Sequence, residues 1–234
     1  MLKIVWEFPT YKVEDKATAG STARRVRTAL TAQEAFKVIA GKDPRPLLVL
    51  RECKTCNGTD DALLSKGADN ERTSLMSTWF HCVKLPVDVL QPDHPFYEMF
   101  GHDDAEHLFV AMPDGSSKIK LQSDTSRTEL WAAMGQMLNS SYKKDTQPVI
   151  KEVRKFLDRM DVLDTRLTGL KEKRNDVIEK DGQHSSKLDK VDSEIAEVHK
   201  EIDAMKAEIA EATKLELKDN GAVKDGSVPA KAGR

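Results

Sequence analysis

Apolar residues recur in alternating steps of four and three along two stretches in the C-terminal half of the chain. The first stretch runs from Val149 to Val177 and the second from Leu188 to Ala212. This spacing is the heptad rhythm of a coiled-coil seam, in which the recurring side chains face a partner helix. The positions that follow it are Val149, Val153, Phe156, Met160, Leu163, Leu167, Leu170, Arg174 and Val177, then Leu188, Val191, Ile195, Val198, Ile202, Met205, Ile209 and Ala212.

A short polar loop separates the two stretches and predicts that the second helix folds back on the first. Gly182 suits the left-handed conformation that often ends a helix, and Ser185 or Ser186 suits the cap of the next one. An antiparallel hairpin within one chain is therefore favoured over a continuous helix that pairs with another chain. The neighbours predicted across the hairpin are Val177 and Leu188, Leu170 and Ile195, and Leu163 and Ile202.

The pattern before residue 143 is that of a compact α/β domain. Thr31 and Glu34 form a capping box that predicts a helix ending at Gly41. Continuous apolar runs predict strands buried on both faces, and alternating runs predict half-buried strands. We expect strands at residues 2–8, 47–50, 78–85, 106–112 and 118–121, a helix at about 60–66 and a closing helix at 127–138.

Aromatic residues divide the chain at the same place. All three Trp, all three Tyr and six of the seven Phe lie before residue 143, and Phe156 is the only aromatic residue after it. Because each aromatic side chain buries a large area, these residues mark a compact core. We expect a domain at residues 1–142 (core about 30–142) that folds on its own, a helical hairpin at 143–217 and a disordered tail at 218–234.

Charge and cysteine content narrow the class of protein. The net charge is −2, so the overall charge does not point to a nucleic acid or an anionic membrane as partner. No run of 18 apolar residues is present, which argues against a membrane-spanning helix. Three cysteines are too few, and an odd number, for a secreted disulfide framework. We expect a cytoplasmic protein, and no cofactor is indicated.

Two of the cysteines, Cys53 and Cys56, form a C-x-x-C motif directly after the apolar run at 47–50. A helix precedes that run, a hairpin turn is predicted at 113–115, and a helix closes the domain. With these four features the chain resembles the thioredoxin superfamily over about residues 30–142. The resemblance implies a thioredoxin-like mixed sheet flanked by helices, followed by the all-α antiparallel coiled-coil hairpin.

The resemblance also implies a chemistry for the two thiols. Cys53 would be the exposed nucleophile that attacks a substrate disulfide, and Cys56 the resolving thiol that releases the product. A helix N-terminus beside a cysteine stabilises its thiolate. The chain departs from the family in one respect: the family usually has a cis-proline just before the third strand, and no proline lies between residues 96 and 112.

The same cysteine spacing is also found in zinc sites. A tetrahedral zinc site needs four ligands. His107 could join Cys53 and Cys56, with water or a second chain as the fourth ligand. Cys82 lies in the middle of a predicted strand, where it fits the role of a small buried hydrophobic residue, with His81 on the opposite face.

Two functions from different classes follow from these observations. The first is a thiol-disulfide oxidoreductase or a thiol redox sensor that uses Cys53 and Cys56. Its coiled coil would dock a protein partner or join two copies of the chain. The second is a non-catalytic thioredoxin-like adaptor, in which the domain anchors a coiled-coil arm.

Overall fold

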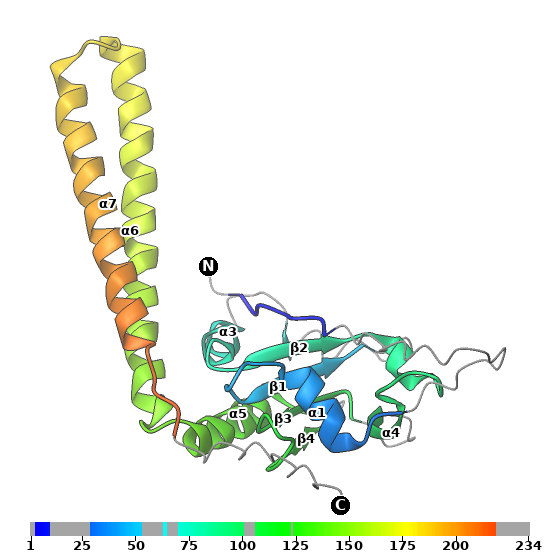
Figure 1. Ribbon diagram of the computed structural model, residues 1–234. Coiled ribbons are helices and arrows are strands. Elements are labelled where there is room, and N and C mark those ends of the chain that lie inside the picture. Colours follow the sequence, from blue (N-terminus) through cyan, green and yellow to red (C-terminus); the bar gives the residue numbers. More distant parts are fainter. Residues whose placement is uncertain are drawn as a thin grey trace, which may run out of the picture.

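The computed structural model describes residues 3–9, 29–52, 63–64, 70–100, 106–122 and 124–218. A four-stranded sheet with helices on both faces forms the globular part, and two long helices extend from it (Figure 1). The elements are α1 (Ala32–Ala40), β1 (Leu47–Arg51), α3 (Glu71–Ser77), β2 (His81–Leu85), η2 (Val87–Leu90), α4 (Tyr97–Phe100), β3 (Leu108–Ala111), β4 (Ile119–Leu121), α5 (Arg127–Ser141), α6 (Thr146–Asp181) and α7 (Ser186–Ala212).

The sheet is mixed, with the strand order β2-β1-β3-β4. β1 pairs parallel with β2 and antiparallel with β3, and β3 forms an antiparallel hairpin with β4. All five residues of β1 are buried. An unbroken apolar run such as Leu47–Leu50 is typical of a central strand that is covered on both faces. The α/β class predicted from the sequence is therefore confirmed.

Two clusters of buried residues lie on the two faces of the sheet, because successive strand residues point to opposite sides. Val49 and Phe109 face α1, η2 and α4. Leu48 and Val110 face α3, α5 and the beginning of α6. The sheet thus forms the middle layer of the globular part.

The ends of several elements follow from local sequence. Thr31 and Glu34 cap α1 reciprocally, as predicted, and Ser126 caps α5 in the same way. The predicted β3–β4 hairpin turns at Gly115, which has a φ of +84°. A Cβ at this position would overlap the ring of Phe36. Glycine therefore satisfies both the backbone conformation and the close approach.

The two long helices lie side by side and run in opposite directions (Figure 1). α6 ends at Gly182, which has a φ of +82°, and the Ser185 side chain accepts a hydrogen bond from the Lys187 N–H to cap α7. Both ends lie where the sequence predicts them. Apolar side chains from the predicted seam form a cluster between the helices: Met160, Leu163, Leu167, Leu170, Ile195, Val198 and Ile202.

The beginning of α6 and the end of α7 share a core with the globular part. Ile150 and Val153 are buried in the cluster on the α5 side of the sheet, and Leu157, Ile209 and Leu217 pack against it. We call residues 146–157 and 209–217 the root of the helix pair, and residues 158–208 the arm. The shared core crosses the boundary predicted at residue 142.

The backbone after α7 also returns to the globular part. Leu217 forms an antiparallel bridge with Tyr142. The Lys218 N–H donates to the Ser141 carbonyl at 2.8 Å, so the ordered chain reaches one residue into the predicted tail. The rest of that tail, 219–234, lies outside the described residues.

Several elements differ from those predicted, and the short helices η2 and α4 are among those that the sequence did not predict. The helix α3 was not predicted, since its Thr and Ser residues have weak helix propensity. β2 begins at His81 rather than at residue 78, because residues 78–80 form the turn that ends α3. Of the strand expected at 2–8, residues 3–8 are described; among them only Glu7 forms a bridge with β2, and Phe8 is 63% exposed. Of the helix predicted at about 60–66, Leu63 and Leu64 are described, and both are helical and buried.

Candidate functional site

The carboxyl end of β1 leads directly into the C-x-x-C motif. Cys53 and Cys56 themselves lie outside the described residues. Glu52, next to Cys53 in the chain, donates its N–H to the Leu85 carbonyl at 2.8 Å. Its carboxylate forms an ion pair with Lys84 at 3.0 Å. The motif therefore begins two residues beyond the end of β1, directly after Glu52, which is hydrogen-bonded to β2.

Arg51 places a buried cation at this strand end. The residue is 5% exposed. Its Nη2 lies 3.2 Å from His107 Nε2, and its backbone N–H donates to the His107 carbonyl at 2.7 Å. A guanidinium only donates, so Nε2 of His107 accepts and the ring proton belongs on Nδ1. This contact engages one of the two nitrogens through which His107 could bind a metal.

Within residues 3–9, 29–52, 63–64, 70–100, 106–122 and 124–218, no three His, Cys, Asp or Glu side chains gather closely enough to hold a metal ion. Of the alternative ligands predicted from the sequence, His107 is described, whereas Cys53 and Cys56 are not. The zinc alternative stays a prediction.

The third cysteine, Cys82, lies where the sequence predicts it. It is 3% exposed and belongs to the cluster on the α5 side of the sheet. Its thiol donates to the Ser77 carbonyl at 3.5 Å. Burial raises the pKa of Cys82 to about 12. At neutral pH Cys82 is therefore a thiol, which is a poor nucleophile.

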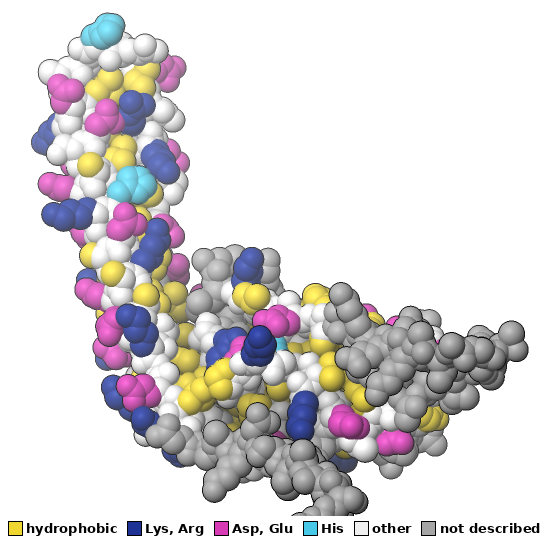
Figure 2. Space-filling model, viewed as in Figure 1, with side chains coloured by type: hydrophobic (Ala, Val, Ile, Leu, Met, Phe, Trp, Pro, Cys, Tyr) yellow, Lys and Arg dark blue, Asp and Glu magenta, His cyan; other side chains and the backbone are white. Residues whose placement is uncertain are grey.

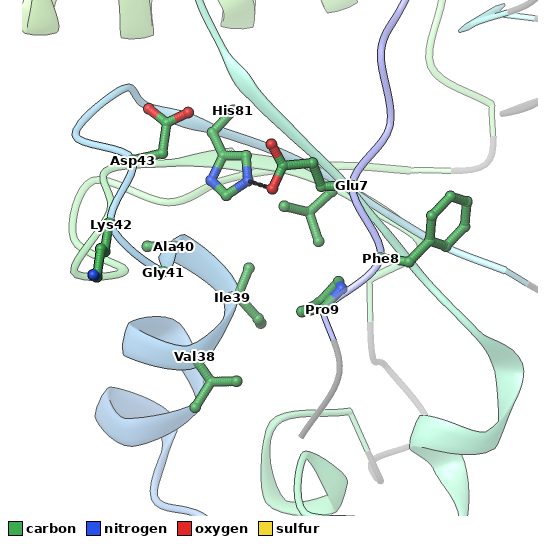
Figure 3. Close-up of a pocket in the computed structure, with 11 residues that line it drawn as sticks. Glu7, Phe8, Pro9, Val38, Ile39, Ala40, Gly41, Lys42, Asp43 and His81 are labelled. Atoms are coloured by element: carbon green, nitrogen blue, oxygen red, sulfur yellow. Dashed lines mark hydrogen bonds and ion pairs between the residues drawn. The ribbon is translucent and has the colours of Figure 1, made fainter. Parts of the chain in front are cut away.

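A pocket of about 470 Å³ lies at the opposite end of β2, on the α1 face of the sheet (Figure 3). The N-terminal segment, the end of α1 with the loop that follows it, and the beginning of β2 form its walls. The lining residues are Glu7, Phe8, Pro9, Val38, Ile39, Ala40, Gly41, Lys42, Asp43, His81 and Val83. The ionisable side chains in this lining are those of Glu7, Lys42, Asp43 and His81.

His81 lies between two carboxylates in this pocket (Figure 3). The residue is 3% exposed, and its Nε2 lies 3.1 Å from Glu7 Oε2. Its Nδ1 has no hydrogen-bond partner among the residues that the structure describes. Burial acts to raise the pKa of Asp43, but hydrogen bonds from Arg45 outweigh it and hold that pKa below its usual value. Asp43 is therefore ionised at neutral pH.

Sequence reasoning did not connect the members of this pocket. Glu7, Asp43 and His81 are far apart along the chain, and no motif spacing links them. The strand alternation did place His81 on the face opposite Cys82, as found in the structure. Glu7 comes close to His81 because it pairs with the edge of β2, and the sequence does not reveal this pairing.

Comparison with known proteins found no matching family model, no matching curated protein and no matching solved structure. Among the described residues, none of the helices has the length and apolar character needed to cross a membrane. On the face shown in Figure 2, Lys and Arg side chains alternate with Asp and Glu side chains along the helix pair. That mixture agrees with the small net charge.

Proposed function

We propose that this chain is a thiol-disulfide oxidoreductase or a thiol redox sensor, with Cys53 as nucleophile and Cys56 as resolving thiol. The observation that carries the proposal is the position of the motif. Cys53 follows the last residue of β1 by two positions, and β1 is a buried central strand. Two residues of chain span at most about 7 Å between Cα atoms, so Cys53 lies near the carboxyl end of that strand.

The arrangement of the sheet supports a thioredoxin-like domain. A helix precedes β1, the motif lies between two parallel strands, and a hairpin and a closing helix complete the order. Parallel neighbours require a long crossover. Residues 52–80 make this crossover, and they contain helical residues at 63–64 and the helix α3.

The charges at the strand end support a reactive thiol. Arg51 is two residues from Cys53 and is held by His107. A positive charge close to a cysteine stabilises the thiolate and so lowers the pKa of the thiol. Cys82 has the opposite environment, because burial raises its pKa to about 12. The chain thus contains its own unreactive reference thiol.

The proposed reaction moves two electrons to the substrate. The Cys53 thiolate attacks one sulfur of a substrate disulfide, which forms a mixed disulfide and releases one substrate thiolate. The Cys56 thiolate then attacks the Cys53 sulfur and releases the second substrate thiolate. The substrate disulfide is reduced, the Cys53–Cys56 pair is oxidised, and a dithiol donor must reduce the pair for another turn. A reducing, cytoplasmic compartment is part of this proposal.

Alkylation at controlled pH tests the proposal. We expect Cys53 to react with iodoacetamide at pH 6 faster than the same cysteine in urea, while Cys82 stays unmodified. Cys53→Ser should abolish reduction of a model disulfide, and Cys56→Ser should trap a mixed disulfide. Cys82→Ala is the matched control and should keep the activity. Equal rates for Cys53 in the folded and unfolded chain would contradict the proposal.

Metal analysis separates the zinc alternative from the redox proposal. A zinc site held by Cys53, Cys56 and His107 would give one equivalent of metal in the purified protein. Both thiols would then be protected together, and a chelator would release them. His107→Ala should lower the metal content in that case. A redox pair without metal should keep its thiol reactivity when the chelator is added.

A second candidate function is a non-catalytic adaptor, and the attachment of the helix pair favours it. The Trp79 Nε1–H donates to the Thr213 carbonyl at 2.8 Å, and the backbone of Lys143 pairs with Glu216. These contacts attach the root to the globular part, and the root in turn holds the arm at a defined position relative to it. The double variant Cys53→Ser with Cys56→Ser separates the two functions. An adaptor should bind its partner as well as the wild type does, whereas an oxidoreductase should lose its reduction of a model disulfide.

We also propose that α6 and α7 form an antiparallel coiled-coil hairpin. Leu163 and Ile202 belong to the same cluster between the helices, which supports the predicted register. Cysteines at 163 and 202 should crosslink within one chain. In the matched control, the first cysteine is placed at position 162 and not at 163. Val162 is 68% exposed, so this variant should not crosslink to position 202. Crosslinks formed only between chains would contradict the hairpin.

A further inference from the structure

Residues 3–9 lie along the outer edge of β2 but are attached to it at one residue. The Glu7 N–H donates to the Cys82 carbonyl, and the Glu7 carbonyl accepts from the Lys84 N–H, both at 2.9 Å. The backbone groups of neighbouring strand residues point to opposite sides. Those of Trp6 and Phe8 therefore face away from β2, and no hydrogen bond joins either residue to another described residue.

This edge also carries exposed apolar side chains. Val5 is 68% exposed and Phe8 is 63% exposed. They are two of the four large apolar side chains that are exposed in the described part of the chain. A strand edge that combines unpaired backbone groups with exposed apolar side chains is a template for another strand.

We propose that residues 3–7 pair antiparallel with the same residues of a second copy, so that two sheets join edge to edge. The segment is complementary to itself about Val5. With a two-fold axis there, Lys3 lies opposite Glu7 of the partner subunit, and Ile4 lies opposite Trp6 of the partner subunit. Each contact occurs twice, as a closed two-fold dimer requires.

The backbone directions agree with this register. The backbone N–H and C=O groups of Ile4 and Trp6 face away from β2, so these two residues form the hydrogen-bonded pairs across the two-fold axis. The two Val5 residues then form the non-hydrogen-bonded pair, with Cβ atoms about 5 Å apart. Lys3 and Glu7 are both exposed, so opposite charges meet at each end. Moving the axis to Lys3 or to Glu7 would place like charges opposite each other, which destabilises strand pairing.

The Glu7 carboxylate can form the ion pair with Lys3 of the partner subunit while it keeps its contact with His81. His81 Nε2 holds Glu7 Oε2 at 3.1 Å, yet the Glu7 side chain is 65% exposed. One carboxylate has acceptor sites for both the imidazole and a lysine. The proposal is independent of the thiol chemistry, because the edge of β2 lies on the opposite side of β2 from β1.

Charge reversal in the full chain tests this interface by sedimentation equilibrium. Lys3→Glu alone and Glu7→Lys alone place like charges in both pairs, and each should weaken the dimer about tenfold. When the two variants are mixed, the acidic side chain introduced in one chain lies opposite the basic side chain introduced in the other. The unchanged Glu7 of the first chain then lies opposite the unchanged Lys3 of the second, so a heterodimer of near wild-type affinity should form. Restoration by mixing cannot come from loss of folding in either variant.

A disulfide at the axis gives a second measurement. Val5→Cys, in a chain with Cys53→Ser and Cys56→Ser, should form a covalent dimer on mild oxidation because the two Cβ atoms are close. Phe8→Cys is the matched exposed control. Its two copies lie six residues apart along the strands, about 20 Å, and should not crosslink.

Three results would overturn the proposal. A wild-type chain that stays monomeric at about 100 µM would exclude the dimer, because a dimer with a micromolar Kd is mostly formed at that concentration. Slow hydrogen exchange at Trp6 and Phe8 in such a monomer would show that another segment of the same chain covers the edge. A dimer that is insensitive to both charge variants would have its interface elsewhere, such as on the helix pair.

Discussion

The root and the arm belong to the same two helices but are stabilised in different ways. In the root, α6 packs against the sheet core, and Val153 has no exposed surface. In the arm, the buried cluster consists of α6 and α7 residues among those that the structure describes, and Leu167 remains 9% exposed. Two helices alone bury less surface per residue than a three-layer core. The root should therefore unfold with the globular part, and the arm more independently.

The polar contacts differ in the same direction. In the root, Trp79 donates a partly buried hydrogen bond to the Thr213 carbonyl. In the arm, Arg174 pairs with Asp192 at 2.6 Å, but the two side chains are 41% and 48% exposed. A buried hydrogen bond is costly to break, whereas an exposed ion pair contributes little. The arm can therefore change in sequence or length with small effects on the globular part.

The largest effect is expected when the root is removed. Residues 1–142 alone would expose the surface that Ile150 and Val153 now cover. The free energy of unfolding of a folded domain is typically about 5–15 kcal/mol. We expect this fragment to lose most of it and to be largely unfolded. Near-UV circular dichroism of the Trp residues measures the loss. A folded fragment would instead support the boundary that the sequence predicts at residue 142.

A chain with a shortened arm is the matched control. Residues 164–201 are replaced by about four Gly and Ser residues, which span the roughly 10 Å between packed helices. This chain keeps the whole root, so the near-UV spectrum should be that of the full chain. Equal loss of structure in both truncated chains would remove the distinction between root and arm.

The next effect separates the two regions with single substitutions. Ile150→Ala in the root should lower the free energy of unfolding by about 3 kcal/mol, because it opens a cavity in the shared core. Leu167→Ala in the arm should cost about 2 kcal/mol or less, since a two-helix layer can relax. Denaturation followed by near-UV and far-UV circular dichroism measures both. Ile150→Ala should shift both signals, whereas Leu167→Ala should shift mainly the far-UV signal.

A smaller effect concerns pH and the joint between the globular part and the root, where Tyr142 forms a bridge with Leu217. The Tyr142 hydroxyl donates to the Trp79 carbonyl at 2.7 Å. Burial raises the pKa of Tyr142 from 10.0 to about 12. The unfolded chain therefore loses this proton first. The stability that Tyr142 contributes is complete below pH 10 and is lost as the pH rises from 10 to about 12.

Tyr142→Phe removes both the hydrogen bond and the titration. We expect it to cost about 1 kcal/mol at pH 7. The difference in stability between the wild type and this variant should shrink between about pH 10 and 12. Chemical denaturation at several pH values measures it, and Tyr97→Phe, outside the joint, is the control. A difference that stays constant across this range would contradict the role of Tyr142.

The sequence predicted elements whose signals are local. The capping box at Thr31, the glycine at 182 and the apolar run at 47–50 each determine structure through neighbouring residues, and all three predictions are confirmed. The heptad spacing likewise places Leu163 and Ile202 in one cluster. Each of these features can be predicted from a local sequence pattern, without information on the contacts of the rest of the chain.

The features that sequence reasoning missed depend on distant residues. The root joins Trp79 to Thr213, which are 134 positions apart, and no periodicity reports such a contact. The pocket around His81 needs the N-terminal segment to lie beside β2, where a single bridge holds it. The helix α3 has Thr and Ser residues whose local preference opposes a helix, and burial of Leu75 and Met76 overrides it.

The smallest effect is expected at the polar position of the arm. Arg174 occupies a seam position that other heptads fill with apolar residues, and its Nε lies 2.6 Å from Asp192 Oδ1. Asp192→Asn should lower the free energy of unfolding by about 0.5 kcal/mol or less, and the effect should vanish in about 1 M salt. Asp203→Asn is the control, because Asp203 pairs with Lys206 within α7 and joins no second helix. A double-mutant cycle with Arg174→Met isolates the interhelical part. A coupling well above about 1 kcal/mol that persists in high salt would mean that ion pairs, and not the apolar seam, hold the arm together.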